Sequence, residues 1–341
     1  MTRPVVRLSS PGELARAIPL LLGYRPTESL VITCLHGDHA TVGLTLRFDL
    51  DALYPLGGVA DMIAARAAVA GADGILVAIY TDQGIEDGDL PCTDLAVDLF
   101  QHPGLWVSDA LLIHHDRWWS YLCHSDECCP MEGTPIELTT SELTALEASM
   151  VLSGSAVMTD RASLVASLAC DEVATSAVQR RRVTRARTRV ARMDPRARRA
   201  ELAKLVTRLS RRMEDPRGIV TDAEAVLVSA LCEDIGARDD LLLQSGSPKR
   251  RMELLSLLRI VVRRMPPPHD AAVCTALAWF AYATGDGTLA NIALDRALDS
   301  DPAYSLALLL ESGLERQLPP SMIEEVVNGA ARDIAARDAA G

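Results

Sequence analysis

The stretch Ile75-Leu-Val-Ala-Ile-Tyr80 decides the fold class of the amino-terminal half of the chain. A short, unbroken apolar run is typical of a central strand that is covered on both faces. An alanine-rich helix is predicted before it, over residues 58–70, and another helix after it, over residues 92–101. Val107 to His114 then reads as a strand, and Arg117 to Cys123 continues it or pairs with it. Strands that alternate with helices predict a layered α/β domain.

The residues before this stretch add a helix and a hairpin. Leu14, Ile18 and Leu21 recur at helical spacing, which predicts a helix over residues 11–22. Ser29 to Leu35 and Thr41 to Asp49 are strand-like and flank a Gly-Asp turn, so they are expected to pair as a hairpin. The sequence therefore predicts an α/β domain with a mixed sheet over residues 1–137.

From about residue 139 onward the pattern is almost entirely helical, which predicts an all-α domain over residues 138–341. Residues 271–302 carry small residues at regular places and end in a proline, as a tetratricopeptide-type repeat does. These positions are Ala278, Ala290, Leu294, Ala297 and Pro302. Because a solenoid needs about three repeats, a plain helical hairpin is an equal alternative to a repeat-like binding surface.

Composition limits the classes of function. The 341 residues are 49% hydrophobic and 23% charged, which is globular composition, and the net charge of −12 argues against a general binder of nucleic acids or anionic membranes. The first residues lack the apolar core of a signal peptide, and no apolar run approaches the roughly 20 residues that cross a bilayer. We therefore expect a cytoplasmic protein with no membrane partner.

The segment Arg117-Trp-Trp-Ser-Tyr-Leu-Cys-His-Ser-Asp-Glu-Cys-Cys-Pro-Met-Glu-Gly-Thr-Pro135 is the most distinctive in the chain. Three interpretations compete for its cysteines: a metal site, a redox pair and structural packing beneath the tryptophans. Structural packing is favoured, and zinc is possible but not favoured, because adjacent cysteines cannot easily both face one ion. The candidate metal ligands are Cys123, His124, Cys128 and Cys129. The candidate ligand-binding residues are Arg47, Arg117, Trp118 and Trp119.

This segment resembles the actinobacterial domain-of-unknown-function 4192 family. Two earlier stretches look like the same family's signatures, Ala17-Ile-Pro-Leu-Leu-Leu-Gly-Tyr-Arg-Pro-Thr-Glu-Ser-Leu-Val31 and Val42-Gly-Leu-Thr-Leu-Arg-Phe-Asp-Leu50. The region from Ala278-Trp-Phe-Ala to Asp301-Pro302 is also similar to it. The resemblance covers nearly the whole chain. It implies an actinobacterial or actinophage origin and a cytosolic protein, but no activity, substrate or catalytic residue.

Residues 180–199 contain ten arginines and a single acid, Asp194, so their net charge is +9 and the rest of the chain carries −12 − 9 = −21. Apolar residues at helical spacing predict one amphipathic helix with a basic exterior. Pairing with the protein's own acids, or solvation, is favoured over an external partner. The candidate partner-binding residues are Arg182, Arg185, Arg189 and Arg192. Nucleic acid is possible but not favoured, because the helix lacks interleaved aromatic residues.

Motifs for phosphate loops, dinucleotide binding, nucleophile elbows and zinc proteases are missing from the sequence. Adjacent His114 and His115 are expected to face opposite sides of a strand and to form no site alone. The leading hypothesis is a binding or regulatory protein that contacts another protein through its helical half. The alternatives are an enzyme or metal-binding protein with its site near residues 117–132, and nucleic-acid binding through residues 180–199.

Overall fold

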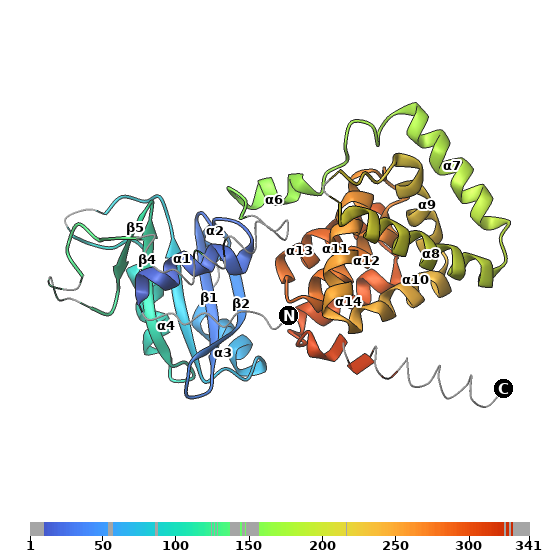
Figure 1. The fold of residues 1–341 in the computed structure, drawn as a ribbon. Coiled ribbons are helices and arrows are strands. Elements are labelled where there is room, and N and C mark those ends of the chain that lie inside the picture. The colour runs from blue at the N-terminus through green and yellow to red at the C-terminus, as the bar shows by residue number, and fades with distance from the viewer. Residues whose placement is uncertain are drawn as a thin grey trace. The chain divides into compact units, whose positions relative to one another are not determined.

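The computed structural model describes residues 10–53, 57–85, 88–123, 125, 127, 129–136, 144, 147, 157–215, 217–323, 325, 326 and 329. The chain forms two compact units, divided between Ser163 and Leu164. Figure 1 shows an α/β unit in blue to green, and a helical unit in green to red.

A six-stranded mixed sheet forms the centre of the α/β unit, as predicted, with the strand order β2-β1-β3-β4-β5-β6. Only β3 and β4 run parallel; every other neighbouring pair is antiparallel. The strands are β1 (Ser29–His36), β2 (Thr41–Asp49), β3 (Gly74–Tyr80), β4 (Val107–His114), β5 (Arg117–Ser120) and β6 (Thr134–Pro135). The predicted hairpin is the β1–β2 pair.

Helices cover both faces of the sheet, which explains why β3 is buried along its whole length. Ile75, Val77 and Ile79 of β3 join a core with α3 (Val59–Val69) and α4 (Thr93–Gln101). The alternate residues of a strand point to the other face, where the hydroxyl of Tyr80 donates a hydrogen bond to the Ala15 carbonyl of α1 (Pro11–Leu22). A short helix, α2 (Leu50–Leu53), follows β2.

The division between the units lies later in the chain than the predicted boundary near residue 137, which falls next to residues outside the described ranges. Met158 explains the later position, because it forms an isolated parallel bridge with Tyr24. Its amide donates to the Gly23 carbonyl at 2.9 Å, and its carbonyl accepts from the Arg25 amide at 3.0 Å. Arg16 of α1 also pairs with Glu147 at 2.7 Å. These contacts hold Glu147 and Met158 against the α/β unit.

The helical unit is built around α12 (Ala271–Ala283), whose thirteen residues are all buried. α12 forms an antiparallel hairpin with α13 (Gly287–Ser300) and also packs against α11 (Pro248–Arg263). The other elements are α6 (Arg161–Ser167), which spans the division, α7 (Ala177–Ala191), α8 (Pro195–Met213), α9 (Asp222–Cys232), α10 (Ile235–Leu242), η1 (Leu243–Gly246) and α14 (Ser305–Glu315). No helix within the described ranges is both long and apolar enough to cross a membrane.

The arginine-rich segment differs from the prediction, because residues 180–199 form two helices and not one. α7 ends at Ala191, and the Asp194 side chain accepts a hydrogen bond from the Ala197 amide as the N-cap of α8. Pro195 then occupies the first turn, where its missing N–H costs nothing. The Thr221–Glu224 capping box that begins α9 is a local signal of the same kind, and both of its hydrogen bonds are present.

Candidate functional site

The two candidate ligand-binding arginines lie on different parts of the sheet. Arg47 of β2 donates to the Ser29 hydroxyl at 2.8 Å and pairs with Asp49 at 2.5 Å. Arg117 of β5 donates to the carbonyls of Glu132 and Gly133 at 2.8 and 2.9 Å. Four strand spacings separate β2 from β5, or roughly 19 Å. The two arginines therefore do not share one ligand groove, and each holds its own loop or strand end.

The two tryptophans of β5 alternate between the faces of the sheet. Trp118 is 7% exposed and lies close to Gly12 of α1. Trp119 packs against the α3–α4 side of the core, and its indole N–H donates to the Met131 carbonyl at 3.0 Å. Both rings therefore take part in packing, and Trp119 together with Arg117 fixes the loop that ends at Gly133.

The predicted cysteine–histidine metal set is described only in part, because His124 and Cys128 lie outside the described residues. Cys123 and Cys129 are half-buried. The Cys123 amide donates to the Ser120 hydroxyl at 3.1 Å, and the Cys129 amide donates to the Ser125 carbonyl at 2.8 Å. The metal-binding role of this set stays a prediction.

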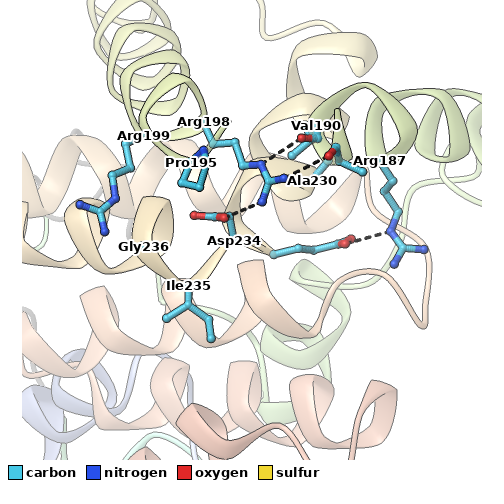
Figure 2. Close-up of a pocket in the computed structure, with 11 residues that line it drawn as sticks. Arg187, Val190, Pro195, Arg198, Arg199, Ala230, Asp234, Ile235 and Gly236 are labelled. Carbon is cyan, nitrogen blue, oxygen red and sulfur yellow. Dashed lines mark hydrogen bonds and ion pairs between the residues drawn. The ribbon is translucent and has the colours of Figure 1, made fainter. Parts of the chain in front are cut away.

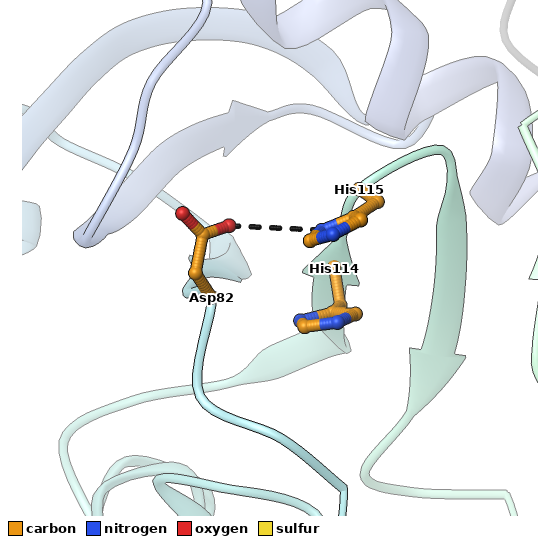
Figure 3. A group of neighbouring side chains, drawn as sticks. All are labelled: Asp82, His114 and His115. Atoms are coloured by element: carbon orange, nitrogen blue, oxygen red, sulfur yellow. Dashed lines mark ion pairs between the residues drawn. The ribbon is translucent and has the colours of Figure 1, made fainter.

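A different cluster, Asp82, His114 and His115, lies at the carboxyl end of β3 and β4. The expectation that the two histidines face opposite sides is wrong. His115 lies outside β4 with a φ of 56°, and this turn stacks its ring on that of His114 at 4.2 Å and 13°. Asp82 follows β3, and its carboxylate lies 3.7 Å from Nδ1 of His115 (Figure 3). Strand periodicity does not reveal this cluster, because it applies only where the backbone is extended at both histidines.

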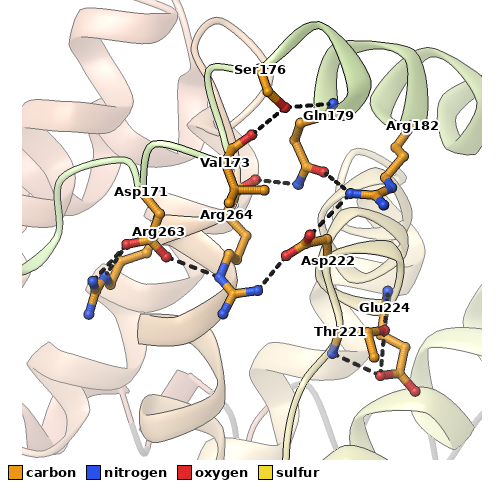
Figure 4. Close-up of polar contacts among 10 residues, drawn as sticks. All are labelled: Asp171, Val173, Ser176, Gln179, Arg182, Thr221, Asp222, Glu224, Arg263 and Arg264. Atoms are coloured by element: carbon orange, nitrogen blue, oxygen red, sulfur yellow. Dashed lines mark hydrogen bonds and ion pairs between the residues drawn. The ribbon is translucent and has the colours of Figure 1, made fainter.

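The arginines on the flanks of α7 pair within the helical unit. Arg182 contacts Asp222 at 3.0 Å, Arg187 contacts Glu233 at 2.9 Å, and Arg189 contacts Glu201 at 3.4 Å. Asp222 also pairs with Arg264, which bridges to Asp171 at 3.0 Å, so this network ties the start of α7 to α9 and α11 (Figure 4). The expected pairing with the protein's own acids thus accounts for part of the arginine set.

Three other arginines form what we call the outer arginine face: Arg181, Arg185 and Arg192. They are spaced by four and seven residues, so they share one side of the helix. All three are exposed, and no ion pair is found for any of them within the described ranges. The opposite side of α7 is buried through Gln179, Val183 and Val190. Of the four candidate partner-binding residues, Arg185 and Arg192 belong to this face, whereas Arg182 and Arg189 are paired.

A pocket of about 540 Å³ lies where α7 and α8 meet the α9–α10 junction (Figure 2). Its charged groups are already matched. Arg198 donates to Asp234 at 2.8 Å and to the Val190 carbonyl at 3.0 Å, and Arg199 lies 3.7 Å from Asp240. Asp234 is the N-cap of α10 and accepts a hydrogen bond from the Ala237 amide. Burial alone would raise the pKa of Asp234, but this hydrogen bond and the one from Arg198 outweigh burial, so the pKa is lowered. The pocket therefore acts as a helix junction more than as a binding site.

Comparison with known proteins identifies one family. The sequence matches the domain of unknown function DUF4192 over residues 11–321. The chain belongs to this family. No curated protein and no solved structure matches the chain. Because the match spans both units, the family is defined by the α/β unit and the helical unit together, and it adds no reaction or ligand to the geometry above.

Proposed function

We propose that this DUF4192 protein binds an acidic segment of a partner protein through the outer arginine face of α7. The observation that carries the proposal is the difference between two sets of arginines on one helix. Those on its flanks pair with acids of α9 and α8, whereas Arg181, Arg185 and Arg192 have no ion pair within the described ranges. A concentrated positive face attracts acidic groups locally, although the chain as a whole carries a net charge of −12.

The binding free energy that three exposed ion pairs can supply indicates what kind of partner fits this face. An exposed arginine–carboxylate pair contributes about 0.2–1 kcal/mol, so three pairs supply at most about 3 kcal/mol. Stable binding therefore needs apolar contact as well. Val178, one helical turn before Arg181, is 57% exposed and offers such an anchor. This combination fits a protein segment that carries both acidic and apolar side chains.

The helical hairpin of residues 271–302 is less suited to partner binding. A repeat-type surface needs an accessible helix face, and every residue of α12 is buried. In this proposal the tetratricopeptide-like pattern reflects close packing of α12 against α13, with small residues such as Ala278 and Ala290 at their contact.

Fluorescence anisotropy of the full chain would test the proposal with a labelled peptide rich in Glu and Leu. The double variant Arg185→Glu/Arg192→Glu should weaken peptide binding at least tenfold, since each replaced charge turns attraction into repulsion. Arg316→Glu is the matched control, because Arg316 is an exposed arginine of the same unit that follows α14. It should leave binding within about twofold, given that screening removes long-range effects at physiological salt.

A duplex DNA of similar charge distinguishes the nucleic-acid alternative. Three phosphate contacts would give a slope of about −3 for log K against log salt. Tighter binding of DNA than of the peptide, with this slope and with loss in the double variant, would replace the proposed partner by a nucleic acid. Equal binding by the parent chain and the double variant would remove the outer arginine face from both functions.

A further inference from the structure

We propose that Asp82, His114 and His115 form a binding site for a divalent transition-metal ion in the α/β unit. The site is independent of the outer arginine face and of the predicted cysteine set. Among the described residues, these three were found to bring one possible ligand atom each to within 4.8 Å of one another.

The position of the cluster follows from the sheet topology. β3 and β4 are neighbouring parallel strands, so their carboxyl ends lie at one edge of the sheet. Asp82 follows β3 by two residues, and His114 is the last residue of β4. Ligands of open α/β sheets bind at this edge, in the loops outside the carboxyl ends of the parallel strands.

His114 is oriented as metal-ligating histidines usually are. Its Nδ1 lies 2.9 Å from the Thr81 carbonyl, which can only accept a hydrogen bond. Nδ1 must therefore carry the proton in this contact, and in the neutral ring Nε2 keeps its lone pair. A backbone carbonyl that fixes the tautomer in this way is the common outer-shell partner of a metal-binding histidine. The half-buried His114 ring therefore has an unprotonated Nε2 whose lone pair can bind a metal ion.

Asp82 is held by an acid that is not itself a proposed ligand. Glu28, the residue before β1, accepts a hydrogen bond from the Asp82 amide at 2.6 Å and from the Thr81 hydroxyl at 3.0 Å. Glu28 has a φ of 43°, which is unfavourable for a non-glycine residue and places it in the chain's turn before β1. The backbone of the ligand loop is therefore fixed, while the Asp82 carboxylate is 75% exposed.

The spacing of the donor atoms is close to that of a bound ion. Ligand atoms at about 2.0–2.1 Å from a tetrahedral ion lie roughly 3.3 Å apart. The Asp82 carboxylate and Nδ1 of His115 are 3.7 Å apart. His115 is 67% exposed, so rotation of its ring brings the three donors together without disturbing the core. Figure 3 shows the nitrogen-bearing sides of both rings turned toward Asp82.

The donor set selects the class of metal. Two imidazole nitrogens and one carboxylate oxygen suit Zn²⁺, Fe²⁺ or Co²⁺, whereas Ca²⁺ and Mg²⁺ prefer oxygen ligands only. Three protein ligands also leave at least one coordination position open, as in catalytic sites and unlike closed structural sites.

Titration of the full chain with Co²⁺ tests the proposal, because the absorption spectrum reports the ligand type. One equivalent should bind, with visible bands but without the intense near-ultraviolet band of cobalt bound to thiolates. Asp82→Asn and His114→Gln should each weaken binding at least tenfold, and Mg²⁺ should not compete. Zn²⁺ should displace the cobalt from the same site.

The matched control is His102→Gln. His102, which is half-buried, and the exposed Asp61 form a histidine–aspartate pair at 3.1 Å in the same unit, but the described residues hold no third donor there. Its loss should leave cobalt binding unchanged. Absence of binding would overturn the proposal. So would a thiolate spectrum that disappears in Cys123→Ser/Cys129→Ser, since it would place the metal on the cysteine segment.

Discussion

Replacement of Asp270 by Asn removes one charge from the most buried ion pair of the helical unit. Asp270 is fully buried, and its carboxylate accepts hydrogen bonds from Arg296 at 2.8 Å and from Ser300 at 2.6 Å. Arg296 also donates to the carbonyls of Val262 and Met265 at 3.0 and 2.9 Å. The guanidinium therefore joins the start of α12 to the end of α11, and Asn keeps the shape of Asp270 without its charge.

The expected loss follows from the charge that is left behind. Removal of one partner from a buried ion pair costs about 3–5 kcal/mol. The remaining carbonyl partners of Arg296 favour the lower end, about 3 kcal/mol. With a urea m-value of about 2–3 kcal/mol/M, the midpoint of unfolding should fall by about 1 M. Far-ultraviolet circular dichroism would follow the transition, because the helical unit dominates that signal.

Two further variants decide whether the ion pair causes the loss. Asp299→Asn is the matched control, since Asp299 is exposed on α13 and has no partner within the described ranges; its midpoint should stay within about 0.2 M of the parent. The double variant Asp270→Asn/Arg296→Gln should recover part of the lost stability, because no unpaired charge remains buried. A shift below about 0.3 M for Asp270→Asn, or strictly additive effects in the double variant, would refute the reasoning.

Three further outcomes are expected. The pKa of Glu224 is lowered, because hydrogen bonds from Arg212 and Thr221 outweigh the burial that would raise it. Glu224 thus adds stability that is complete above the ordinary glutamate pKa of 4.5 and is lost as the pH falls through the lower pKa of the folded state, so Glu224→Gln should flatten the decline of thermal stability below pH 4.5. Gly133→Ala should cost the α/β unit about 2 kcal/mol in urea unfolding, because Gly133 has a φ of 76° and an added Cβ would lie 2.3 Å from the Trp119 ring. Burial raises the pKa of Cys232 to about 12, so mass spectrometry should detect its alkylation at pH 8 only after unfolding.

Features that depend on neighbouring residues could be predicted from the sequence. The apolar run from Ile75 to Tyr80 became β3, buried on both faces, because such a run has no polar side for solvent. Thr221 and Glu224 form a capping box that the Thr-x-x-Glu spacing alone indicates, since both partners lie within one helical turn. The unit boundary depends instead on Met158, whose backbone forms hydrogen bonds with Gly23 and Arg25, more than a hundred residues earlier in the chain. A periodic sequence pattern does not predict a pairing between residues so far apart.

The histidine cluster was missed for a different physical reason. Strand periodicity places adjacent side chains on opposite faces only while the backbone stays extended. His115 is the first residue after β4 and has a φ of 56°. Histidine is one of the few residue types enriched at positive φ. The His-Asp pair between two strand-like runs was therefore the available signal for a turn at this position.

In the arginine segment, helical periodicity separates the arginines that form ion pairs from those that stay exposed, whereas a count of charges does not distinguish them. The count of ten arginines against one acid predicts a basic helix but does not say which arginines meet the acids that follow. The buried side of α7, through Gln179 and Val183, determines the answer. Arginines adjacent to that side, such as Arg182, reach acids on α9, whereas those directly opposite, such as Arg185, are exposed. A charge-reversal experiment on this helix should therefore compare the two sides, because a partner on the proposed outer arginine face would break no ion pair found within the described ranges.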